Sequence, residues 1–149
     1  MNPATRFLAE ANLARLSRYL RLLGFDAEIS SGSFYQLAAR AIRENRVLLT
    51  KRKTHPEFAG LRVISLSPDN PLDQLRCLDN ETGVLKSAKP FTRCPVCNQI
   101  LEPVDKARVL GRVPSFIYAT HSRFKRCPAC GRIYWPGSHV RRFKALFSG

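Results

Sequence analysis

Acidic residues are scarce in this sequence. Its 149 residues include 25 Lys and Arg but only 11 Asp and Glu, which gives a formal net charge of +14. This charge exceeds what solubility requires of a small domain, and it favours a polyanionic partner. The excess lies mainly in residues 76–149, which hold 14 basic and 4 acidic residues. We therefore expect the C-terminal half to carry most of a nucleic-acid-binding surface.

Long apolar runs and lipidation patterns are also missing. Because no stretch approaches the length of a transmembrane helix, nucleic acid is a better candidate partner than a membrane. Residues 1–10 lack a basic segment followed by an apolar one, so we expect a cytoplasmic protein without a signal peptide. The isolated glycines Gly24, Gly32 and Gly60 indicate turns rather than a phosphate-binding loop.

Cysteine, in contrast, is present in a specific pattern. Two C-P-x-C pairs, Cys94 with Cys97 and Cys127 with Cys130, have the spacing of a tetrahedral zinc site. Four thiolates leave no open position on the metal, so the predicted role is structural. Two disulfides are the alternative, which the expected cytoplasmic location disfavours. The 29 residues between the pairs predict an insertion, roughly residues 98–124, and the remaining Cys77 is expected to be buried in a helix.

The first 85 residues alternate short apolar strands with amphipathic helices, which predicts an α/β fold with a parallel sheet covered on both faces. We expect strands over residues 5–9, 25–29, 46–50 and 61–66, helices over residues 12–23, 35–44 and 71–78, and a helical turn after residues 51–55. A linker over residues 86–90 would separate this domain, residues 1–85, from a zinc ribbon over residues 90–149 that ends in a basic helix, residues 140–147.

Five segments of the chain resemble one family, the Mut7-C RNase domain. They are Phe7–Leu16, Tyr19–Asp26, Arg46–Thr50, Arg93–Asn98 and Cys127–His139. The resemblance implies a PIN-like nuclease fold with a C-terminal zinc ribbon. It also implies carboxylates at the carboxyl ends of the strands that hold Mg²⁺ or Mn²⁺ and activate a water against a phosphodiester.

The sequence departs from the family's acidic pattern. Glu10 takes the place of the first-strand Asp, residues 30–34 contain no carboxylate where one is expected, and Arg52 stands where the family has an Asp after the third strand. A permanent cation does not suit a dication site, so we expect a degenerate nuclease centre. Glu10 and Asp26, together with Asp69 and Asp73, are the candidates for a replacement cluster.

Basic residues suggest three RNA contacts. Arg15, Arg18 and Arg21 recur on the first helix, and Lys51, Arg52 and Lys53 lie at the mouth of the expected crevice. The third group surrounds the second cysteine pair and comprises Arg123, Lys125, Arg126, Arg132, Arg141 and Arg142. Phe124, Tyr134 and Trp135 are aromatic residues that could stack on bases, although for Trp135 packing within the ribbon is the preferred role. His121 and His139 are not needed as metal ligands beside four thiolates and are expected to be structural or exposed. His55 could contact phosphate or act as an acid, but the sequence identifies no partner for it.

Three functions therefore follow from the sequence. The preferred one is a zinc-stabilised RNA-binding protein whose ribonuclease site is degenerate. The second is an active endoribonuclease that uses Glu10, and the third is a module that docks on a ribosome or another ribonucleoprotein without turnover. The sequence specifies neither the RNA nor the oligomeric state.

Overall fold

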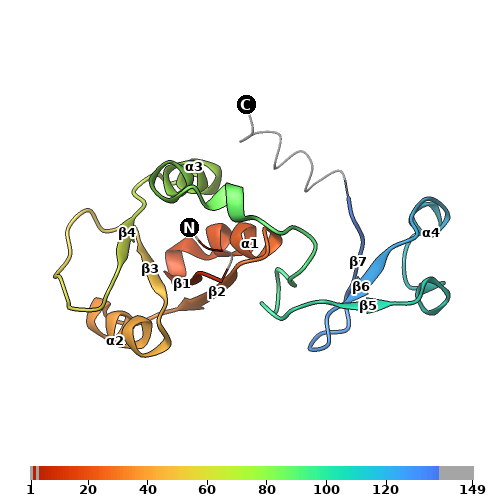
Figure 1. The fold of residues 1–149 in the computed structure, drawn as a ribbon, viewed down its shortest axis with the longest axis horizontal. Helices are drawn as coiled ribbons and strands as arrows, with labels where there is room; N and C mark the ends of the chain where they lie inside the picture. The colour runs from red at the N-terminus through yellow and green to blue at the C-terminus, as the bar shows by residue number, and fades with distance from the viewer. Residues whose placement is uncertain (1, 3, 138–149) are drawn as a thin grey trace.

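The computed structural model describes residue 2 and residues 4–137. A four-stranded parallel sheet forms the centre of the N-terminal part, with strands β1 (Arg6–Glu10), β2 (Asp26–Ser30), β3 (Val47–Thr50) and β4 (Val63–Ser65) in the order β2-β1-β3-β4 (Figure 1). The predicted parallel α/β sheet is confirmed. Each strand lies within two residues of its predicted position, because short buried strands carry a clear apolar signal.

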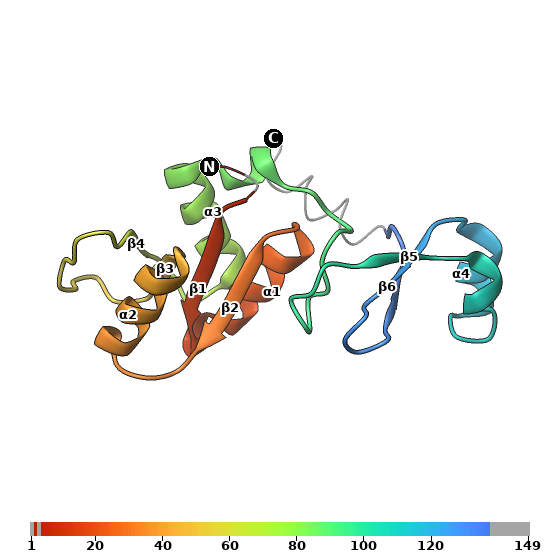
Figure 2. The same ribbon diagram turned by 60° about the horizontal axis from the view of Figure 1, so that its bottom comes forward.

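Helices cover both faces of the sheet. One face packs against α1 (Ala14–Leu22), which follows a 3₁₀ turn at Ala11–Leu13, and against α3 (Pro71–Thr82). The other face packs against α2 (Phe34–Glu44) (Figure 2). Successive side chains of β1 alternate between these two cores, with Phe7 and Ala9 in the first and Leu8 in the second. Glu10 therefore emerges on the α2 side of the sheet.

Capping residues set the helix ends. α2 begins one residue before its predicted start because Ser33 and Gln36 form a reciprocal capping box. α3 runs four residues past its predicted end, to a left-handed Gly83. The helical turn expected after residues 51–55 does not form, and residues 51–62 are a loop. Pro56 contributes to this, since proline disfavours the helical conformation of the residue before it.

Cys77 is exposed, and the prediction that it is buried was wrong. The buried residues of α3 are Pro71, Gln74, Leu75 and Leu78, which follow helical spacing. Cys77 lies outside this stripe and points away from the core.

The segment predicted as a linker is attached to the core. The predicted linker, residues 86–90, overlaps the end of a 3₁₀ helix, η2 (Val84–Ser87), in which Val84 is fully buried, and Ala88 packs against the same cluster. Lys89 then donates a backbone hydrogen bond to the carbonyl of Leu23.

The C-terminal part contains a three-stranded antiparallel sheet of β5 (Glu102–Val104), β6 (Phe124–Arg126) and β7 (Ile133–Tyr134). Between β5 and β6 lie a 3₁₀ helix, η3 (Lys106–Val109), and α4 (Ser115–Thr120), which form the predicted insertion. The predicted basic helix over residues 140–147, with Arg141 and Arg142, and His139 lie outside the described residues. None of the described helices is long and apolar enough to cross a membrane.

Candidate functional site

A cavity of about 430 Å³ opens at the carboxyl ends of β1 and β3. From β1 the chain runs first to β2 on one side and then crosses to β3 on the other side of β1. Strands β1 and β3 therefore flank the topological switch point of the sheet. Open α/β sheets bind ligands at this position. The lining residues are Glu10, Ala11, Asn12, Ser30, Ser31, Gly32, Leu37, Lys51 and Arg52.

Glu10 is the acidic residue of this cavity. Its Oε1 accepts a hydrogen bond of 2.6 Å from the hydroxyl of Thr50, and its Oε2 accepts one of 3.4 Å from the backbone N–H of Lys51. The Nε of Arg52 lies 3.8 Å from Oε1. The carboxylate is therefore surrounded by donors and one cation.

Lys51 and Arg52 are the two cations of the cavity, and Arg52 stands where the resemblance implies an Asp. Lys51 bonds to Asp69, and this hydrogen bond lowers the pKa of Asp69 below its ordinary value of 3.8. The guanidinium of Arg52 lies 5.6 Å from the centre of the Phe34 ring. Asp69 does not line the cavity itself and contacts it through its ion pair with Lys51. Asp73 pairs with Arg76 on α3. These acids do not form a cluster with Glu10.

Asp26 lies at the opposite end of the sheet from Glu10, so its assignment beside Glu10 was wrong. It pairs in register with Arg6, at the amino end of β1, whereas Glu10 pairs with Ser30. Four residues of strand separate the two carboxylates, about 13 Å. Burial alone would raise the pKa of Asp26, but hydrogen bonds from Arg46 (2.8 Å) and Asn98 (2.8 Å) outweigh it and lower the pKa.

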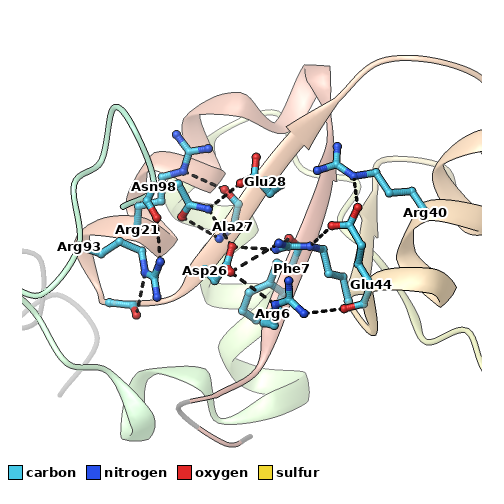
Figure 3. Close-up of polar contacts among 12 residues, drawn as sticks. Arg6, Phe7, Arg21, Asp26, Ala27, Glu28, Arg40, Glu44, Arg93 and Asn98 are labelled. Carbon is cyan, nitrogen blue, oxygen red and sulfur yellow. Dashed lines mark hydrogen bonds and ion pairs between the residues drawn. The ribbon is translucent and has the colours of Figure 1, made fainter. Parts of the chain in front are cut away.

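Asn98, the residue after the first cysteine pair, joins the C-terminal part to the edge strand β2. Its Oδ1 accepts from the N–H of Ala27 at 3.1 Å, and its Nδ2 donates to Asp26 and to Glu28 (Figure 3). The side chain is buried and satisfies a backbone donor of the sheet edge. No pattern in the sequence assigned Asn98 a role.

Arg21 completes the same contact. It is only 7% exposed, and it donates to the carbonyl of Ala27 at 2.8 Å and to the carbonyls of Pro95 and Val96 at 3.1 and 3.2 Å. The prediction that Arg21 contacts RNA therefore does not fit its position, because the guanidinium is used within the protein. Arg15 and Arg18 are exposed on α1, and their contact with RNA stays a prediction.

The four cysteines of the two pairs form one cluster, in which the sulfur atoms lie within 4.8 Å of one another. Sulfur atoms bound to one tetrahedral Zn²⁺ at about 2.3 Å would be about 3.8 Å apart, and the Sγ atoms of Cys94 and Cys130 are 3.9 Å apart. The residues present thus fit a closed metal site. Among the described residues, these four cysteines are the His, Cys, Asp or Glu side chains that lie close enough together to hold a metal ion.

The two cysteine pairs share one backbone geometry. The residue after each pair, Asn98 or Gly131, has a positive φ of 63° or 75° and donates its N–H to the carbonyl of the first cysteine of that pair. Tyr134 adds a contact of 3.1 Å between its hydroxyl and the Sγ of Cys94. Burial is the main reason that the pKa of Tyr134 is raised.

The aromatic residues proposed for base stacking make contacts within the C-terminal part of the protein. Phe124 is buried and makes an edge contact with Trp135, with ring centroids 6.5 Å apart, and Tyr134 packs beside the cysteines. Phe124 is therefore not available to a base. Among the cations of the predicted RNA surface, Arg123 and Lys125 lie over the Phe91 ring, Arg126 pairs with Glu102, and Arg132 is exposed.

Comparison with known families gives one match, to the Mut7-C RNAse domain, over residues 5–147. This chain belongs to the Mut7-C RNAse domain family. The match covers the parallel sheet and the cysteine cluster alike, so the Mut7-C assignment concerns both parts. Searches of curated proteins and of solved structures found no match. Membership of the Mut7-C family suggests a nuclease-like or RNA-related role, in which the switch-point cavity is the candidate ligand site.

Proposed function

We propose that this Mut7-C protein binds RNA and that its metal-dependent ribonuclease centre is degenerate. The observation that carries the proposal is the composition of the switch-point cavity, where Glu10 faces Lys51 and Arg52 instead of further carboxylates. The cavity keeps the position of a nuclease site but has the charge of a phosphate-binding site.

The residues of the cavity do not fit Mg²⁺ or Mn²⁺. These ions take hard oxygen ligands and are usually held through one or two carboxylates together with substrate phosphates. Glu10 already accepts from Thr50 and faces the guanidinium of Arg52, whose charge is permanent. A dication placed there would be repelled by Arg52, whereas a phosphate would be attracted to Arg52.

RNA as the partner is supported by the charge of the chain and by its distribution. The formal charge is +14, and four zinc-bound thiolates with one Zn²⁺ would change it by −4 and +2, to +12. Exposed cations lie beside the cavity at Arg52 and Lys53 and on α1 at Arg15 and Arg18. Contacts of this kind go mainly to phosphates and give affinity without strong sequence preference.

Zinc is the metal we propose for the cysteine cluster. Four thiolates suit zinc or an iron–sulfur cluster, and one tetrahedral ion matches the sulfur separation described above. The four ligands would leave no position for a reactive water, so the zinc is structural. It would hold the two cysteine turns together and keep Asn98 in place against β2.

The experiment that tests this proposal incubates zinc-loaded protein with labelled single-stranded and structured RNAs, in Mg²⁺, Mn²⁺ or EDTA, and scores retention and cleavage together. We expect retention without cleavage in all three conditions. Glu10→Gln should bind RNA at least as tightly as the parent, because it removes a negative charge from the cavity. Glu81→Gln, the same change on the exposed surface of α3, is the matched control.

Other results would assign other functions. Cleavage that requires a divalent ion and is lost in Glu10→Gln would contradict the proposal and identify an endoribonuclease. Saturable retention of structured RNA alone would favour a module that docks on a ribonucleoprotein. Absence of both retention and cleavage would contradict an RNA-binding function.

A further inference from the structure

The insertion between β5 and β6 forms a tip at the end of the molecule farthest from the parallel sheet (Figures 1 and 2). We define this tip as residues 105–120, comprising η3, a turn at Leu110 and Gly111, and α4. It contains none of the residues of the switch-point cavity or the metal centre.

Few contacts hold the tip in place. Val109 is fully buried, the Nζ of Lys106 lies 4.8 Å from the centre of the Tyr118 ring, and Arg112 donates to the carbonyl of Gly131 at 3.1 Å. The Lys106 contact joins η3 to α4, and the Arg112 contact joins the tip to the second cysteine turn. α4 itself buries none of its residues.

Two large apolar side chains of the tip are in contact with water. Phe116 is 72% exposed and Leu110 is 66% exposed, whereas Phe124 and Trp135 of the same module pack against each other. The covered side of α4 carries the half-buried Ile117 and Tyr118, and Phe116 lies outside it. The Phe116 ring therefore contributes little to folding and is accessible to a partner.

The charge of this part of the sequence favours an anionic partner. No acidic residue occurs after Asp105, and residues 106–137 include seven Lys and Arg. Lys106, Arg108 and Arg112 belong to the tip itself. A partner that offers both negative charge and flat apolar surfaces is single-stranded RNA, whose unpaired bases stack on aromatic rings while its phosphates bind cations. Base faces are not accessible in a duplex.

We propose that the tip binds single-stranded RNA, with the Phe116 ring stacked on a base and Arg108 and Arg112 in contact with the adjacent phosphates. This inference rests on the proposed RNA-binding function and adds a second contact, distant from the cavity. RNA that occupies both would run along the molecule from the sheet to the end of the zinc module.

The test measures the Kd of the full-length, zinc-loaded protein for labelled single-stranded oligoadenylate by fluorescence anisotropy. Phe116→Ala should raise Kd about tenfold, the usual effect of removing one aromatic stacking partner. Phe116→Tyr should keep the parental affinity because it keeps the ring, and Phe116→Leu should behave as Phe116→Ala. Ile100→Ala, at another exposed apolar residue of the same module, should leave Kd unchanged. Zinc content and thermal unfolding establish that each variant is folded.

The results separate two claims, that the protein binds RNA and that the tip contributes to this binding. If the parent protein binds and Phe116→Ala does not differ from Ile100→Ala, the tip inference is overturned while the RNA-binding function stands. Full affinity in Phe116→Leu would also overturn it, since an apolar contact without a ring is not base stacking. If the parent protein does not bind, both are overturned. Arg108→Ala should in addition flatten the slope of log K against log salt by about 0.7.

Discussion

Asn98 is a residue on which the attachment of the cysteine module depends. Its amide accepts from the backbone of Ala27 and donates to two carboxylates, and its backbone φ of 63° shapes the first cysteine turn. The second turn has Gly131 at the same place. Turn geometry therefore requires only a residue that tolerates a positive φ, and the side chain of Asn98 serves the contact with β2.

Asn98→Gly separates these two roles. We expect full zinc content, because the turn keeps its conformation, and a loss of about 2 kcal/mol in the free energy of unfolding, because buried charge-assisted hydrogen bonds are removed. Zinc content by a colorimetric assay and urea unfolding provide the measurement. Asn45→Gly is the matched control, since Asn45 is an exposed residue with a φ of 53° at the end of α2. Reduced zinc binding in Asn98→Gly would refute the separation of roles.

At the scale of elements, the cysteine module has little core of its own. Its buried cluster is Cys94, Leu101 and Cys127, so two of its three members are metal-ligand candidates. The parallel sheet, in contrast, is packed between two larger apolar clusters. We therefore expect the arrangement of strands β5, β6 and β7 to depend on a bound metal, and that of the parallel sheet not to.

Metal removal should consequently unfold one part before the other. Trp135, the only tryptophan of the chain, lies against Phe124 in the cysteine module and reports on it. A chelator should shift the Trp135 fluorescence towards that of exposed indole while most of the circular dichroism signal of the helices persists. Cys97→Ser should reproduce this shift and Cys77→Ser should not, because Cys77 is exposed on α3. Simultaneous loss of both signals would contradict the assignment.

At the scale of the whole molecule, the excess of positive charge should control RNA affinity. If about six phosphates are contacted by the cavity, α1 and the tip, log K should fall against log salt with a slope of about −4 for a single strand. Anisotropy titrations over a range of salt concentrations measure this slope. A slope near zero would show that phosphate contacts are not the main source of affinity.

The sequence predicted the features that short-range patterns determine. Alternating apolar strands and helices indicated the parallel sheet, and the C-P-x-C spacing indicated the cysteine cluster. Contacts between distant residues were not accessible in this way. Arg21 was read as a surface cation, although it bonds to carbonyls 74 and 75 residues further along the chain. Asn98 lies 71 residues from Ala27 and carries no local signal for this contact.

Asp26 could have been placed correctly from the sequence. Asp26 is the first residue of its strand. The first residues of parallel strands lie at the end of the sheet opposite the ligand site, which is at the carboxyl ends of the strands. Glu10 and Asp26 share a residue type but lie at opposite ends of their strands. The exposure of Phe116 could not be predicted, because the sequence of a helix as short as α4 does not show which of its faces is covered.

The two ends of the parallel sheet have different roles, so residues at one end can be substituted without disturbing the other. Arg46, Asp26 and Asn98 anchor the cysteine module near the amino ends of the strands, whereas the cavity lies at the carboxyl ends. Substitutions at the cavity leave the anchoring contacts intact. The residues of the cavity, Arg52 included, can therefore change with little effect on the stability of the rest of the fold.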